Sequence, residues 1–94
     1  MVMIWDTKIN CLGMREFSTA VKVHDVTLDG KWILLSEPSA SMCYISDATT
    51  QNLQIVWSYP LSGGLISGAI QENGELVAFA YRQDGMEIVQ RLRR

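Results

Sequence analysis

Residues 24–37, HDVTLDGKWILLSE, can be laid over residues 68–81, GAIQENGELVAFAY, without a gap. The turn glycines of the two stretches, Gly30 and Gly74, stand 44 positions apart. The apolar positions that coincide at this offset are Val26 with Ile70, Ile33 with Val77 and Leu35 with Phe79. The chain therefore contains an internal repeat.

The strand that follows each stretch belongs to the same repeat. Residues 42–45 match residues 86–89 at the offset of 44, and VMIWD at residues 2–6 lies over CYISD at residues 43–47 at an offset of 41. A four-stranded blade of a β-propeller repeats at about 40–45 residues, and few other all-β folds do. The spacing therefore predicts sheet modules of this kind.

Short apolar runs separated by turn residues follow one another along the chain, and helical periodicity is nearly absent. This pattern is typical of an antiparallel all-β protein. Asp29-Gly30, Asn73-Gly74 and Gln83-Asp84-Gly85 lie between apolar runs and predict hairpin turns, because such residues tolerate positive φ. The predicted strands are residues 2–5, 9–17, 21–28, 32–36, 42–45, 53–59, 65–70, 76–81 and 86–92.

Nine strands make a little over two blades of four strands each. With strands named a to d from the propeller axis outward, residues 1–17 give the c–d end of one blade, residues 18–60 a full blade and residues 61–94 strands a–b–c of the next. At 94 residues the chain is one domain at most. A closed propeller needs at least four blades, so we expect the chain to belong to a longer protein or to pair with copies of itself or with a partner.

Two kinds of segment resemble WD repeats. Val2-Met3-Ile4-Trp5-Asp6 is similar to the strand that ends such a repeat, and residues 26–36 are similar to its a–b hairpin with an Asp-Gly turn; residues 70–80 are similar with Asn-Gly. The resemblance covers nearly the whole chain as a pattern. It implies a non-catalytic protein-interaction scaffold within a multi-subunit assembly. The spacing of residues 23–36, VHDVTLDGKWILLS, and of residues 66–79, ISGAIQENGELVAF, also resembles the propeller subunits of the ubiquitin ligase with LisH and CTLH helices.

The chain departs from the polar network of well-formed WD repeats, which joins a His before strand a, a Ser or Thr on strand b, an Asp in the b–c turn and a Trp on strand c. Ser36 offers the hydroxyl and Trp5 the indole, but the turn at residues 37–41 has no Asp. Ser46 and Gln90 replace the Trp in the later repeats, and His24 falls inside strand a. We therefore expect no such network around His24 and expect apolar packing to hold the blades.

Composition and charge exclude several classes of function. The net charge is −2, and the basic cluster Arg91, Arg93 and Arg94 is expected to be a solvated end, so no nucleic-acid partner is predicted. No run of about 18 apolar residues occurs, and the first residues do not resemble a signal peptide. We therefore expect no membrane span and expect the protein to be located in the cytoplasm or nucleus. Cys11 and Cys43 are predicted to be reduced thiols, with one disulfide as the alternative.

No combination of residues predicts catalysis, a metal site or a cofactor. His24-Asp25 is the one His–carboxylate pair in the sequence, and neighbours in a regular strand point to opposite faces. One His and two scattered Cys do not make a zinc site. Residues 62–64, Ser-Gly-Gly, match neither a nucleophile elbow nor a phosphate-binding loop.

The aromatic residues Trp57, Tyr59 and Trp32 are the predicted partner-binding residues, with ordinary packing between blades as the alternative reading for Trp57. The five Met residues are expected to fill gaps between blades. The predicted contact loops are residues 37–41 and 83–85 on one rim and residues 62–64 on the other.

Two other readings stay open at this point. One is an accessory propeller domain of a peptidase or of a binding protein. The other is a small, oligomeric β-sandwich that acts as a binding module. Two glycine-turn hairpins that share one sheet, or face each other across a sandwich, would contradict the blade reading.

Overall fold

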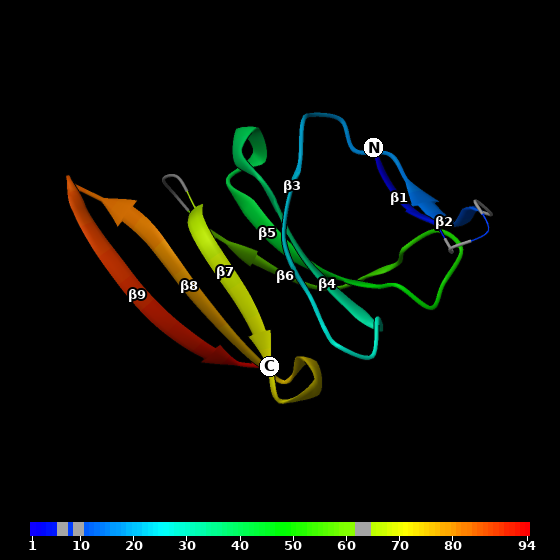
Figure 1. Cartoon of the computed structure of the whole chain (residues 1–94). Helices are drawn as coiled ribbons and strands as arrows, with labels where there is room; N and C mark the ends of the chain where they lie inside the picture. The colour runs from blue at the N-terminus through cyan, green and yellow to red at the C-terminus, as the bar shows by residue number, and fades with distance from the viewer. Residues whose placement is uncertain (6–7, 9–10, 62–64) are drawn as a thin grey trace.

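The computed structural model describes residues 1–5, 8, 11–61 and 65–94. In this part of the chain nine strands form three antiparallel sheets, and strands adjacent in sequence are adjacent in the sheet (Figure 1). The first sheet holds β1 (Val2–Trp5) and β2 (Cys11–Arg15); the second holds β3 (Lys22–Val26), β4 (Trp32–Glu37), β5 (Met42–Asp47) and β6 (Ile55–Pro60); the third holds β7 (Leu65–Gln71), β8 (Leu76–Gln83) and β9 (Met86–Arg93). The predicted antiparallel all-β class is confirmed.

Two of the predicted glycine turns differ in detail. Gln83 pairs with Met86, so Asp84-Gly85 is a two-residue turn, and both of its residues have positive φ (53° and 76°) as a type I′ turn requires. In Asp29-Gly30 only the glycine has positive φ, 73°, and its N–H donates to the carbonyl of Thr27. Both hairpins form, but the second has the longer turn.

Leu53 is a correction to the predicted strand at residues 53–59. It lies in the turn before β6 with a φ of 47°, and its N–H donates to the carbonyl of Thr50. Its side chain is fully buried. The residue looked like part of a strand because it is apolar, but it reaches the core from a left-handed turn conformation. The strands predicted at residues 9–17 and 21–28 are also shorter, with residues 9–10 outside the described part.

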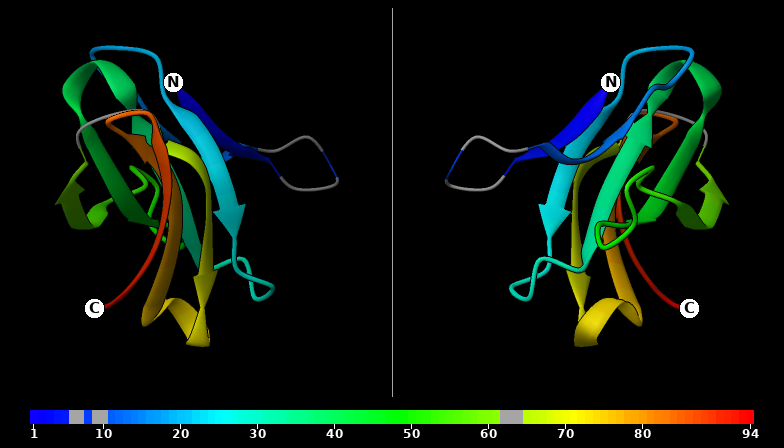
Figure 2. Two further views of the ribbon diagram at one scale, coloured as in Figure 1. Left: turned by 90° about the vertical axis from the view of Figure 1, so that its left-hand side faces the viewer. Right: turned by 90° about the vertical axis from the view of Figure 1, so that its right-hand side faces the viewer.

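The three sheets lie one behind another in sequence order, as the side views of Figure 2 show. We call the face of the middle sheet, β3–β6, that lies against β7–β9 its forward face, and the face against β1–β2 its rear face. The forward contact buries Leu34, Cys43 and Ile45 against Ile70, Val77 and Phe79. The rear contact buries Ile33, Leu35 and Leu53 with Val2. The middle sheet is therefore covered on both faces, which is why β4 is a run of buried residues from Ile33 to Glu37.

Residues at equal positions of the repeat lie on equal faces of their sheets. Ile33 and Leu35 lie on the rear face of the middle sheet, and 44 positions later Val77 and Phe79 lie on the rear face of β7–β9. Side chains alternate along a strand, so Ala78, between them, lies on the forward face of the third sheet. The two glycine-turn hairpins thus lie in separate sheets that present the same face in the same direction.

A glycine permits close approach at each of the two contacts between sheets. A Cβ on Gly68 of β7 would lie 2.6 Å from Leu34 Cδ2, and a Cβ on Gly13 of β2 would lie 2.8 Å from Leu53 Cδ2. In both cases the leucine comes from the middle sheet or its turns and is fully buried. Each glycine therefore lets a leucine pack directly on the backbone of the neighbouring sheet.

The cysteines and methionines complete the comparison with the predicted packing. Both thiols are free, as expected; Cys43 is buried and Cys11 is exposed. Burial raises the pKa of the Cys43 thiol to about 11. The prediction that methionines fill gaps between sheets is wrong for most of them. Met1, Met3, Met14 and Met86 are exposed, because the faces or ends that carry them are not covered by another sheet.

Candidate interaction surfaces

Two of the predicted partner-binding residues, Trp57 and Tyr59, lie on β6 at the edge of the middle sheet. Their rings stack at a centroid distance of 5.8 Å, and Phe79 of the third sheet stacks on both, at 6.3 Å from Trp57 and 6.0 Å from Tyr59. Both residues are partly buried against the forward cluster. Much of each ring is therefore used to hold two sheets together, and only the remaining exposed part is accessible to a partner.

Trp32, the third predicted residue, begins β4 and is also partly buried against the forward cluster, but its ring has other neighbours. Arg94 and Lys31 place their cationic groups 4.9 Å and 4.8 Å from its ring centroid. Gly74, in the short 3₁₀ turn η2 (Glu72–Gly74), lies against the ring, since a Cβ there would be 2.6 Å from Trp32 Cδ1. Trp32 thus anchors the turn before β8 and the end of β9 to the middle sheet, and does not contribute to the ring stack of Trp57 and Tyr59.

The predicted loop at residues 37–41 is exposed only in part. Pro38–Ala40 form the 3₁₀ turn η1, whose residues are all exposed. Glu37 is instead the last residue of β4 and is buried, so its place in a contact loop is a wrong prediction. Turn residues Asp84-Gly85 are exposed, as predicted for a contact loop.

The carboxylate of Glu37 is held by three donors. The Thr19 hydroxyl and N–H donate to Oε2 at 2.8 and 3.2 Å, and the Tyr44 hydroxyl donates to Oε1 at 2.8 Å. These hydrogen bonds, first those from Thr19 and then that from Tyr44, lower the pKa of the Glu37 carboxyl below its usual value. Glu37 therefore fixes the segment between the first two sheets to the end of β4, which is a structural role.

The end of β6, just before the third predicted contact loop, lies at the same end of the middle sheet as η1. Residues 62–64 lie outside the described part of the chain, but Leu61 directly before them donates its N–H to the Ser41 carbonyl at 2.9 Å. Strands β4 and β6 run parallel to each other on either side of β5, so both end at the same end of the sheet. Figure 1 places η1 and the end of β6 accordingly.

His24 corrects the prediction that it takes no part in a polar network. Its Nε2 shares a hydrogen bond of 2.7 Å with Ser36 Oγ. The register between β3 and β4 shifts between Val23 and Asp25, so His24 is an extra residue at a β-bulge. Burial, and after it the charge of Lys22, lowers the pKa of the His24 imidazole. Trp5, expected to offer its indole to such a network, is instead exposed.

The bulge also changes the direction of Asp25. Its Oδ2 accepts a hydrogen bond of 2.8 Å from the Ile70 N–H, so the carboxylate reaches from the middle sheet to β7. A Cβ on Gly68 would lie 3.7 Å from the His24 Cβ, so His24 lies toward the same sheet. The expectation that His24 and Asp25 point to opposite faces fails because regular alternation is interrupted at a bulge. The two side chains bond to different groups and not to each other.

A hollow of about 430 Å³ lies at the end of the sheets where β3 turns into β4. Its lining consists of Asp25, Val26, Thr27, Leu28, Asp29, Ile70 and Asn73. Leu28 at its margin has a relative exposure of 109%, the most exposed large apolar residue of those described. Sequence reasoning passed over Leu28 because an apolar residue just before a turn looks like the end of a strand.

The outward faces of the two outer sheets also carry exposed apolar residues. On β1–β2 these are Met3, Trp5, Leu12 and Met14, each 43–53% exposed. On β7–β9 a shallow hollow of about 180 Å³ is lined by Ser67, Ala69, Ala78, Ala80 and Val89, together with Gly68 and Phe79. The internal repeat is the sequence signal that could have indicated these surfaces. The corresponding faces of the middle sheet are covered by a neighbouring sheet, so the same positions in the outer sheets offer apolar side chains.

The described residues include no group of three or more His, Cys, Asp or Glu side chains that could hold a metal ion. Nor does any helix in the described ranges have the length and apolarity needed to cross a membrane. Comparisons with protein-family models, with curated proteins and with solved structures find no match to this chain.

Proposed function

We propose that this chain is a segment of a WD-repeat β-propeller and serves as a protein-interaction scaffold without catalytic activity of its own. The observation that carries the proposal is the repeated packing of the sheets. Rear-face residues Val77 and Phe79 contact the sheet before them, as Ile33 and Leu35 do one repeat earlier. Blades of a propeller stack in this manner around an axis.

The coverage of the middle sheet favours this reading over a two-sheet sandwich. In a sandwich each sheet buries one face and exposes the other to solvent. Here β4 carries Leu34 on the forward cluster and Ile33 and Leu35 on the rear cluster, all buried. A stack of modules supplies a partner sheet for both faces.

The turns at the two ends of the sheets are the proposed contact surfaces. One end carries η1 and the Asp84-Gly85 turn, and the other carries Leu28 beside the hollow of about 430 Å³. Rigid sheets hold such turns in place, so little conformational entropy is lost when a partner binds. The exposed parts of Trp57, Tyr59 and Trp32 would add aromatic contact area at the sheet ends and edge. The partner is a protein of a multi-subunit assembly in the cytoplasm or nucleus, with a LisH–CTLH ubiquitin ligase as the first one to test.

The test is purification of partners on the natural full-length protein, followed by re-binding of each purified partner. Ser39→Arg in η1 and Leu28→Arg beside the hollow alter one end each, and Ala20→Arg in the exposed linker before β3 is the matched control. We expect a stoichiometric complex with the wild type and the control, and binding at least about tenfold weaker with one of the end variants. If no partner re-binds, or if both end variants bind as the wild type does, the scaffold proposal is wrong.

A further inference from the structure

The outward faces of the first and third sheets are the two halves of one kind of contact. We propose that they bind each other between copies: the rear face of β1–β2 in one copy lies on the forward face of β7–β9 in the next, so that copies associate head to tail. The inference rests on the proposed function in one respect, the stacking of equivalent sheets. It adds a partner, a second copy of this chain, and the surface that this partner uses.

The forward face of β7–β9 matches a face that is fully covered one repeat earlier. At the offset of 44, Leu34 corresponds to Ala78 and Ile45 to Val89. Leu34 and Ile45 have an exposure of 0%, because the third sheet lies on them, whereas Val89 is 73% exposed. The position in the repeat is the same, and only the covering sheet differs.

Small side chains of β7 and β8 leave the hollow of about 180 Å³ on this open face. Alanines Ala78 and Ala80 of β8 lie beside Val89 of β9, with Ser67 and Ala69 of β7 completing the floor. None of the described residues that line this hollow is charged. Glu87 and Arg91 alternate with Val89 along β9, so they lie on the same face beside the hollow, and the apolar contact is confined to the hollow itself.

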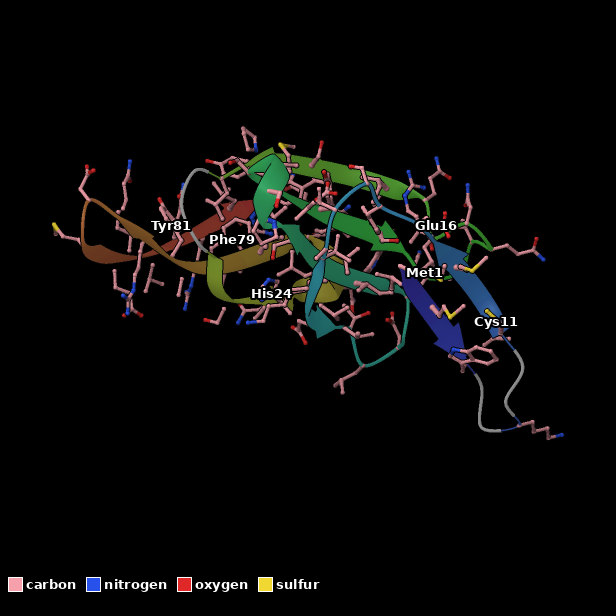
Figure 3. The ribbon with its side chains drawn as sticks, turned by 90° about the horizontal axis from the view of Figure 1, so that it is seen from above. Met1, Cys11, Glu16, His24, Phe79 and Tyr81 are labelled. Carbon is pink, nitrogen blue, oxygen red and sulfur yellow. The ribbon has the colours of Figure 1, made fainter. Side chains whose placement is uncertain are left out.

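The rear face of β1–β2 has the opposite shape. Met3 and Met14 are register partners, and Trp5 lies two residues after Met3 on the same face, with Leu12 at the bulge beside it. All four are exposed and none belongs to either buried cluster. Figure 3 shows this hairpin, with Met1 and Cys11 labelled, at the end of the molecule opposite the third sheet.

The large side chains on the rear face of β1–β2 and the hollow on the forward face of β7–β9 are complementary in shape, as close packing requires. At the offset of 41, Met3 corresponds to Tyr44, which packs on the rear cluster of the middle sheet. Rear-face residues of the repeat thus already contact a preceding sheet inside the chain. Every copy carries both halves, so a second copy can cover either face with the complementary face of its own. A contact between two different faces is heterologous and yields a ring or an open chain of copies.

The first experiment is sedimentation velocity on the purified chain over a wide range of concentration, with circular dichroism as a check of folding. Ala80→Arg fills the hollow, and Met14→Asp places a charge on the rear face of β2; both positions lie on outward faces. We expect the wild type to associate with increasing concentration. Each variant alone should associate about thirtyfold more weakly or not at all.

An equimolar mixture of the two variants decides the geometry. Each variant keeps one intact face, so the mixture should form a one-to-one complex that grows no further. If either folded variant still self-associates as the wild type does, copies meet through like faces and the proposal is wrong. A wild type that stays monomeric at every concentration also overturns it.

A cross-linking experiment gives a second test that does not depend on weakening the contact. Cys11 lies across from Trp5 on β2 and is exposed, whereas Cys43 is buried. In Val89→Cys, mild oxidation should join Cys11 of one copy to position 89 of the next, as peptide mapping would show. The controls are the same variant with Cys11→Ser, and Met86→Cys, whose exposed thiol lies at the β8–β9 turn. Equal yields at positions 86 and 89 would contradict the proposal.

The two proposals fail in distinguishable ways. A wild type that binds its protein partner but stays monomeric at every concentration refutes the head-to-tail contact and leaves the scaffold function standing. If copies associate head to tail but no protein partner re-binds, the scaffold proposal is wrong and the head-to-tail contact stands.

Discussion

The forward faces of the middle and third sheets occupy the same positions of the repeat and have different surroundings. Ile45 is completely buried under the third sheet, and Val89, its counterpart, is 73% exposed. The repeat register decides which face a side chain lies on, since alternation along a strand is local. Whether that side chain is buried depends on the next sheet, which local pattern does not describe. A repeat protein of this kind gains its stability from contacts between modules.

Truncating the side chains of both counterparts, Ile45 and Val89, tests this comparison most strongly. Ile45→Ala removes a side chain in the forward cluster and should lower the free energy of unfolding by about 2–5 kcal/mol. Val89→Ala should change it by no more than about 0.5 kcal/mol. Urea denaturation at a protein concentration that keeps copies apart measures both. Equal losses would mean that the two faces are covered alike.

Two turn glycines repeat the contrast between a covered and an open site. Gly74 and Gly85 both have positive φ, 89° and 76°, but a Cβ on Gly74 would meet Trp32, whereas a Cβ on Gly85 would have no neighbour within 4 Å. Gly85→Ala should cost about 1–2 kcal/mol for the left-handed backbone alone. Gly74→Ala adds the overlap with the indole and should cost about 2–4 kcal/mol. Thermal unfolding of the two variants side by side measures the difference, and equal losses would contradict the contact between Gly74 and Trp32.

The polar attachment of the middle sheet gives a smaller, pH-dependent effect. Glu37→Gln should lower stability near neutral pH by about 1 kcal/mol, because Thr19 and Tyr44 lose a charged acceptor. The folded-state pKa of Glu37 is lowered, so its contribution is present above the ordinary pKa of Glu and disappears as the pH falls through the lowered value. The difference between wild type and variant should therefore shrink on acidification. Glu16→Gln, the same substitution at an exposed position, is the matched control variant.

His24 should give the smallest effect. Its folded-state pKa lies below the ordinary 6.5, so the folded protein favours the neutral imidazole that bonds to Ser36. Stability is then lost as the pH falls from about 6.5 through the lowered value, because the unfolded chain takes up the proton first. His24→Gln should remove this part of the acid dependence and cost less than about 1 kcal/mol near neutral pH. Urea denaturation at a series of pH values measures this for both proteins. If the free energy of unfolding changed equally with pH in the wild type and in His24→Gln, the His24 assignment would be wrong.

Much of the fold follows from short-range signals in the sequence. The strands were predictable from alternation within a few residues, and three hairpins, β3–β4, β7–β8 and β8–β9, also have a glycine turn. Which apolar residues are buried was less predictable from the sequence than the strands. Met3 and Met14 were expected to pack, but an apolar residue on a strand is buried only if another sheet covers its face.

The candidate surfaces were predictable in type and not in detail. Trp57 and Tyr59 stand out by composition, but their stack with Phe79 joins residues from two sheets that are about 20 positions apart in sequence. The hydrogen bond of His24 with Ser36 was missed because it depends on a bulge that no residue type announces. Leu53 was misplaced for a similar reason, since its left-handed turn conformation is unusual for a leucine.

The most direct test of the stacked-sheet account is a pair of nuclear Overhauser effects in the dissociated chain. The structure predicts one between the Leu34 δ-methyl and the Gly68 α-protons, across the forward contact, and another between the Leu53 δ-methyl and the Gly13 α-protons, across the rear contact. Observing both places the middle sheet between its two neighbours. A chain whose strands are assigned as described but whose Leu34 methyl contacts only residues of its own sheet would contradict the account.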